Sequence, residues 1–214
     1  MSSARVLVVL LAVLAVAGSS KPGRNLRAAA SDGGITKGLD EIVAKERLPD
    51  PKQLRGFCDR GDLDACEQLA AMLAFGKGVA RDEVAAAQLD LSTCDKGSGS
   101  ACAALAIAYW EGRGVIASDE KARALVARAM ATGGAVAIGE FGNLYGAGLG
   151  LPRNDERAQY LLTLACDASD ARSCADLATL SLTPEPERAR LADKACTLGS
   201  SAGCERLRQI NERP

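Results

Sequence analysis

Cys94-Asp-Lys-Gly-Ser-Gly-Ser-Ala-Cys102 is a segment that recurs along the chain, each time with two cysteines eight positions apart. The other copies are Cys58/Cys66, Cys166/Cys174 and Cys196/Cys204. Cys58 lies 36 residues before Cys94, and Cys166 lies twice that distance after it. Where the same register predicts a further pair, the chain has Met130 and Ile138 instead. A fixed period of this length is typical of a helical solenoid, in which each repeat buries the apolar face of its neighbour.

The residues between the cysteine segments predict two helices per repeat. Apolar residues at helical spacing predict a first helix over about 100–111 and a second over about 119–131. Gly112-Arg-Gly114-Val115 separates them, and glycine suits the left-handed residue that ends a helix. We therefore expect an all-α protein, a right-handed α/α solenoid of helix hairpins with a 36-residue period, over residues 36–211.

The ends of this array depart from the regular unit. A capping helix is expected over about 36–47, followed by a short helix from Pro51 to near Cys58 with Asp50 as its N-cap. The fourth repeat lacks the Gly-x-Gly loop and is six residues shorter, and a last helix over about 202–211 closes the stack.

The repeat also predicts which cysteines form disulfides. The end of one second helix and the start of the next first helix meet across a turn, so two cysteines eight positions apart can approach each other. Pairing within a hairpin instead would join Cys66 to Cys94 and leave other cysteines without a partner. The first scheme also explains why positions 130 and 138 both lack cysteine. We therefore expect Cys58–Cys66, Cys94–Cys102, Cys166–Cys174 and Cys196–Cys204.

The N-terminal residues indicate export. One positive charge at Arg5, an apolar run from Val6 to Ala17 and a polar stretch after it are typical of a cleavable signal peptide over residues 1–17. The run is shorter than the roughly 20 residues of a transmembrane helix, so no stable membrane span is expected after cleavage. Residues 18–35 are predicted to be a flexible leader. A periplasmic or secreted location favours disulfides over cytosolic thiol chemistry.

Composition excludes several function classes. The formal net charge is −1 and aromatic residues make up 3% of the chain, so a nucleic-acid partner is not expected. The chain has no histidine, and a Cys-x7-Cys spacing does not match zinc sites. We therefore predict no metal ion and no cofactor.

The unit from Cys94 through Cys102, Leu105, Tyr109, Gly112-x-Gly114-Val115 and Ala122 resembles the Sel1-like repeat, a relative of the tetratricopeptide repeat. With its cysteine pairs, the chain looks most like the Helicobacter cysteine-rich proteins, over about residues 36–211. The resemblance implies an exported protein that binds protein partners. Some members are described as binding penicillin with weak β-lactamase activity, so the resemblance also implies that alternative.

The strongest candidate for catalysis is Ser118-Asp-Glu-Lys121, which fits the Ser-x-x-Lys of serine β-lactamases. The equivalent positions in the neighbouring repeats are Asp82 and Asn154, and all three residues are preferred N-caps. No Lys-Thr-Gly or Ser-Asp-Asn motif accompanies Ser118 and Lys121. We therefore interpret Ser118 as a helix cap and predict a scaffold in preference to an enzyme.

A scaffold of this kind binds through the concave face formed by successive first helices. The predicted partner-binding residues lie at non-core positions of these helices: Gln68, Met72, Ala104, Ile107, Ala108, Glu140, Asn143, Leu144, Asp176 and Leu180. A protein or peptide partner is expected there. Trp110 has no aromatic equivalent in other repeats, and the sequence leaves open whether it packs under a loop or forms an exposed contact.

Overall fold

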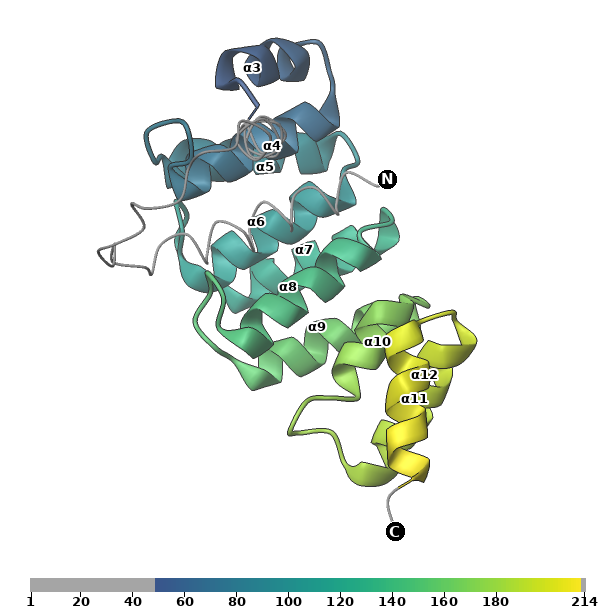
Figure 1. The fold of residues 1–214 in the computed structure, drawn as a ribbon. Coiled ribbons are helices and arrows are strands. Elements are labelled where there is room, and N and C mark those ends of the chain that lie inside the picture. Colours follow the sequence, from purple (N-terminus) through teal and green to yellow (C-terminus); the bar gives the residue numbers. More distant parts are fainter. Residues whose placement is uncertain (1–48, 213–214) are drawn as a thin grey trace, which may run out of the picture.

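A computed structural model describes residues 49–212, and within this range all regular structure is α-helical (Figure 1). The helices are α3 (Pro51–Asp59), α4 (Leu63–Phe75), α5 (Glu83–Asp95), α6 (Gly99–Glu111), α7 (Asp119–Ala131), α8 (Ala135–Ala147), α9 (Asp155–Asp167), α10 (Ala171–Leu177), α11 (Glu185–Thr197) and α12 (Ser201–Asn211). The predicted second helix over 119–131 is therefore confirmed at both ends.

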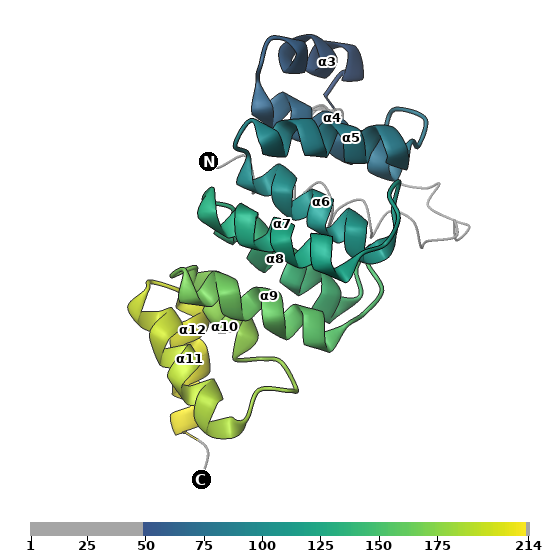
Figure 2. The same cartoon turned by 180° about the vertical axis from the view of Figure 1, so that it is seen from behind.

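The helices form hairpins that stack along one axis, from α3 and α4 at one end to α12 at the other (Figures 1 and 2). Successive helices of each hairpin, α4 with α5, α6 with α7 and α8 with α9, make the most extensive contacts. The first helices α6 and α8 also contact each other across the stack. The fold is thus the all-helical solenoid that the period predicts.

Helix ends are specified by the same residue types in each repeat. The second helices α5, α7 and α9 begin at Asp82, Ser118 and Asn154, and each side chain accepts a hydrogen bond from a backbone N–H of the first turn. The first helices α4, α6 and α8 each end at a glycine with φ of 66°, the left-handed conformation that costs other residues energy. These caps set a helix length of 13 residues in all six helices.

Alanine is the main residue of the interhelical contacts. Ala103, Ala106, Ala122 and Ala129 are fully buried, and they belong to one core cluster that runs from α5 to α9. Small side chains allow the helix axes to approach closely. Larger buried residues such as Tyr145 fill the space that remains between the helices. The core is therefore continuous from α5 to α9, and two further clusters of buried residues lie towards the ends of the stack, one in α3 and α4 and one in α9 to α11.

Four disulfides join consecutive hairpins in the predicted pairing: Cys58–Cys66, Cys94–Cys102, Cys166–Cys174 and Cys196–Cys204. Each connects the last turn of one helix to the first turn of the next, with Cα–Cα distances between 4.4 and 4.7 Å. At the turn between α7 and α8, Ile138 is fully buried and Met130 packs against the same core. At this turn both positions of the missing disulfide therefore contribute to the apolar core.

We expect the double substitution Cys94→Ala and Cys102→Ala to lower the free energy of unfolding by about 2–3 kcal/mol, because the nine-residue closed loop restricts the unfolded chain. Both cysteines are fully buried, so alanine also leaves a small cavity. Urea denaturation followed by circular dichroism, under non-reducing conditions, measures the change. An unaltered midpoint relative to the oxidised wild type contradicts a stabilising role.

The fourth repeat is shortened in its first helix. Helix α10 has only seven residues, and Leu180, predicted to lie on a helix, follows its end. Arg188 of α11 holds this segment by donating to the carbonyl oxygens of Thr183 (2.8 Å) and Leu180 (3.3 Å). The missing residues change the direction of the stack, and α11 and α12 run steeply across α9 in both views (Figures 1 and 2).

Three predictions fall outside the described residues: the signal peptide over 1–17, the leader over 18–35 and the capping helix over 36–47. Within residues 49–212, no helix has the length and apolar character needed to cross a membrane.

Candidate functional site

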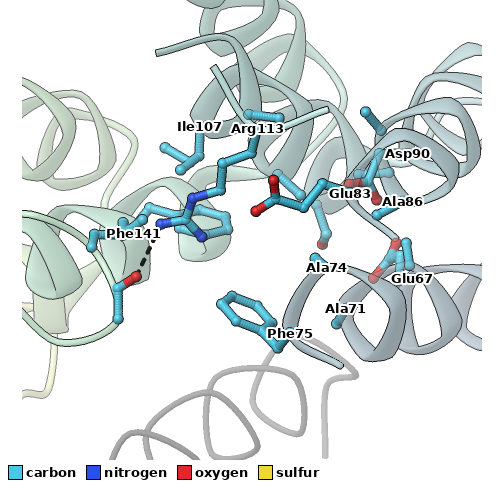
Figure 3. Close-up of a pocket in the computed structure, with 18 of the residues that line it drawn as sticks. Glu67, Ala71, Ala74, Phe75, Glu83, Ala86, Asp90, Ile107, Arg113 and Phe141 are labelled. Carbon is cyan, nitrogen blue, oxygen red and sulfur yellow. Dashed lines mark hydrogen bonds between the residues drawn. The ribbon is translucent and has the colours of Figure 1, made fainter. Parts of the chain in front are cut away.

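A pocket that opens to solvent lies between α4, α5, α6 and α8, with a cavity volume of about 80 Å³. Eight of the twenty residues that line it are alanines: Ala70, Ala71, Ala74, Ala86, Ala87, Ala101, Ala104 and Ala108. Phe75 and Phe141 add larger apolar surface (Figure 3), as does Leu144. A concave, mainly apolar surface with a few polar groups is typical of a ligand site.

Two carboxyl groups lie together at one end of this pocket (Figure 3). Glu67 comes from α4 and Asp90 from α5, and each side chain is only 8% exposed. The Ser98 hydroxyl donates a hydrogen bond to Glu67. Asp90 has no hydrogen-bond donor among residues 49–212.

The environment disfavours ionisation of both acids. Burial raises the pKa of Asp90 well above its ordinary value, and the nearby charge of Glu67 raises it further. Burial also raises the pKa of Glu67, while the hydrogen bond from Ser98 opposes that shift. Perturbed carboxyl groups that face a pocket are characteristic of functional sites.

These two acids occupy positions that carry no charged residue in the next two repeats. One and two repeats later, the position of Glu67 is occupied by Ala103 and Gly139. The position of Asp90 is occupied by Val126 and then by Leu162, which are both buried in the core. The signal was present in the sequence, because a charged residue stood where other repeats have an apolar one.

The opposite end of the pocket carries the loops that follow α6 and α8. Arg113 donates a hydrogen bond to the carbonyl oxygen of Gly150 (3.0 Å), and its guanidinium lies 5.8 Å from the centre of the Phe75 ring (Figure 3). Glu83 lies on the wall and pairs with Arg81 at 2.5 Å. The pocket is therefore acidic at one end and has a cationic group near the other.

The structure brings four of the predicted partner-binding residues to this pocket: Ala104, Ile107, Ala108 and Leu144. Ala104 and Ala108 remain partly exposed, whereas Ile107 and Leu144 are largely buried and contribute only to the wall. The part of the predicted first-helix face that lines the pocket therefore comes from α6 and α8.

The other predicted positions lie elsewhere. Met72 is 2% exposed and packs in the core with Leu54 and Cys58, and Glu140 is 5% exposed, so neither forms the accessible surface that we expected. Both faces of a first helix are covered in the stack, which explains the error. Gln68 and Leu180 are half-buried outside the pocket. Asn143 donates a hydrogen bond to Asp176 (2.6 Å), which ties α8 to α10.

Ser118 acts as the N-cap of α7, since its hydroxyl accepts a hydrogen bond from the backbone N–H of Lys121 (3.3 Å). The Lys121 ammonium lies over the Tyr109 ring, 5.3 Å from its centre. Each side chain therefore has a structural contact of its own.

Trp110 packs inside the molecule at the contact between two hairpins. It is 7% exposed, and its indole N–H donates to Asp119 (2.8 Å). The rings of Tyr145 and Tyr160 meet it edge to face, and the Arg157 guanidinium lies 5.2 Å from the centre of its ring. The question that the sequence left open is thus answered in favour of packing.

Comparison with known proteins gives one matching family model and two similar solved structures. A family model described as Sel1 repeat matches residues 63–98, 99–129 and 136–170. A Sel1 repeat protein from Oxalobacter formigenes shares 20% identity over 77% of this chain and 71% of its own, with a TM-score of 0.51. At this identity the similarity concerns the fold alone.

The protective antigen c5321 of uropathogenic Escherichia coli strains, which displays an SLR fold, shares 20% identity over 75% of this chain, with a TM-score of 0.47. The match covers 36% of that antigen's length. No curated protein matches the chain.

Proposed function

The chain is a Sel1-like repeat protein, and on this basis we propose that it is an exported scaffold whose pocket between α4, α5, α6 and α8 binds a peptide segment of a partner protein. Sel1-type repeats are scaffolds typical of protein–protein interaction, because stacked hairpins present an extended concave surface. The observation that carries the proposal is the pocket itself, which is lined by alanine side chains and holds two buried acids.

Two features support export. The four disulfides are of the kind that persists in an oxidising compartment, and the run from Val6 to Ala17 has the composition of a signal peptide. A periplasmic or secreted protein with these cross-links keeps its repeat surface rigid. Rigid surfaces lose less entropy when they bind a partner.

Selection from a displayed random-peptide library against the oxidised protein tests this function. We expect enriched peptides to lose at least about tenfold in affinity with Ala104→Phe, because the new ring fills the pocket. Ala131→Phe, at an exposed residue that ends α7, is the matched control and should leave the affinity unchanged. Circular dichroism checks that both variants fold.

Peptides that bind both variants equally contradict the pocket as the binding site. Failure to enrich any peptide contradicts the function itself.

A further inference from the structure

We propose that the acidic end of the pocket recognises a lysine side chain of the bound peptide, with the ammonium group between Glu67 and Asp90 and the aliphatic stem against the alanine wall. This inference rests on the proposed function and adds to it the residue that the pocket selects. Four features of the site support it.

The first feature is the lack of a donor for Asp90. The side chain is 92% buried, it faces the pocket in Figure 3, and no group of residues 49–212 donates a hydrogen bond to it. A buried carboxyl group without a partner destabilises a fold. A ligand that brings N–H donors into the pocket supplies the missing interaction.

The second feature is the contrast between repeats. Val126 and Leu162 show that an apolar residue fits the position of Asp90, so packing does not require an acid there. The same holds for Glu67, whose equivalents are Ala103 and Gly139. Two acids have thus replaced apolar residues in one repeat only, and they meet in one pocket.

The third feature is the apolar wall, which selects the kind of cation. Ca²⁺ takes six to eight oxygen ligands, and residues 49–212 contain no group of three or more His, Cys, Asp or Glu side chains that could hold a metal ion. Alanine methyl groups favour a cation on a hydrocarbon stem.

The fourth feature is the origin of the two carboxyl groups on different helices. The separate carboxyl groups suit the compact ammonium of lysine, which has three rotatable donors, better than the planar fork of arginine, which matches a single carboxylate.

Recognition of this kind depends on pH. The charged groups that line the pocket around Asp90 are Glu67, Glu83 and Arg113, and α6 and α8 contribute none. Because burial raises the pKa of both Asp90 and Glu67, each acid of the free protein holds its proton to a higher pH than an exposed carboxyl group does. An ammonium group favours the ionised carboxylates, so binding releases protons and becomes tighter as the pH rises.

Isothermal titration with the peptide acetyl-Ala-Leu-Lys-Leu-Ala-amide and its norleucine counterpart tests the inference on the full oxidised protein. We expect the lysine peptide to bind at least about tenfold more tightly, and to release protons in a pair of buffers with different ionisation enthalpies. Asp90→Asn and Glu67→Gln should each remove most of this preference. Glu120→Gln removes an exposed charge on α7 and should leave it unchanged.

The thermal midpoint of the free protein gives a second readout. A folded-state pKa above the unfolded value means that stability is lost as the pH rises through it, so Asp90→Asn should raise the midpoint at pH 7. The difference should vanish at a pH near the ordinary pKa of aspartate. A lower midpoint at pH 7 shows that Asp90 is held by the fold and overturns the inference.

Other outcomes also overturn it. Equal affinity for the lysine and norleucine peptides, tighter binding of an arginine counterpart, or no binding of the lysine peptide at millimolar concentration each excludes lysine recognition. Library peptides that still require an open pocket would then leave the proposed function standing, so the two failures are distinguishable.

Discussion

Trp110→Ala should lower the free energy of unfolding by about 3–5 kcal/mol, the range for removing a large buried aromatic side chain. The substitution deletes ring contacts to Tyr145 and Tyr160, a cation–π contact with Arg157 and the hydrogen bond to Asp119. These partners belong to the following hairpin or to the start of α7, so the cavity opens between repeats. The expected effect is therefore a loss of cooperativity along the stack as well as of stability.

Urea denaturation followed by circular dichroism at 222 nm measures this change, because Trp110 is the only tryptophan and its fluorescence is lost with it. Ile116→Ala is the control: Ile116 lies in the adjacent loop and is 91% exposed, so its removal should change stability by less than about 0.5 kcal/mol. Equal effects of the two substitutions would show that the aromatic cluster contributes nothing to the fold.

Gly114→Ala should destabilise the protein by about 2–5 kcal/mol, for two separable reasons. Gly114 has a φ of 68°, which disfavours alanine, and an added Cβ would lie 2.0 Å from the carbonyl oxygen of Glu83. That oxygen belongs to the first residue of α5, so the loop after α6 rests directly on the preceding hairpin.

The repeat provides a matched control in Gly150. It occupies the equivalent loop position with a φ of 70°, but an added Cβ there meets nothing within 4 Å. Gly150→Ala should cost only the backbone strain, about 1–2 kcal/mol. The difference between the two variants in urea denaturation gives the energy of the steric clash, and equal values would contradict close packing at Gly114.

The sequence predicted the period, the hairpins and the cysteine pairing because each depends on residues that recur. The caps Asp82, Ser118 and Asn154 and the equivalent loop glycines mark the same helix ends in several copies. Repetition thus made local signals reliable. The predictions failed or remained open where a single repeat differs from the rest, or where burial depends on how neighbouring hairpins stack.

The pocket is the clearest example. The acids Glu67 and Asp90 were missed because we sought the binding face only at non-core positions, whereas both occupy positions that are apolar in other repeats. Met72 was assigned to the surface because a helical period does not show that both faces of a first helix are covered. The partners of Trp110 could not be predicted either, since Tyr145 and Tyr160 reach it through the superhelical arrangement of hairpins.

The turn between α7 and α8, where Met130 and Ile138 replace the cysteine pair, gives the molecule an uneven response to proteolysis. A protease that cuts inside any of the four Cys-to-Cys loops leaves two fragments that a disulfide still holds together. A cut within residues 132–134 yields two polypeptides with no covalent link, each of which retains two intact cross-links. Among the turns that join one hairpin to the next in residues 49–212, this is the one turn that no disulfide spans. Of the cuts at these turns, non-reducing electrophoresis of a partial digest should therefore show two separate fragments only when the cut falls here.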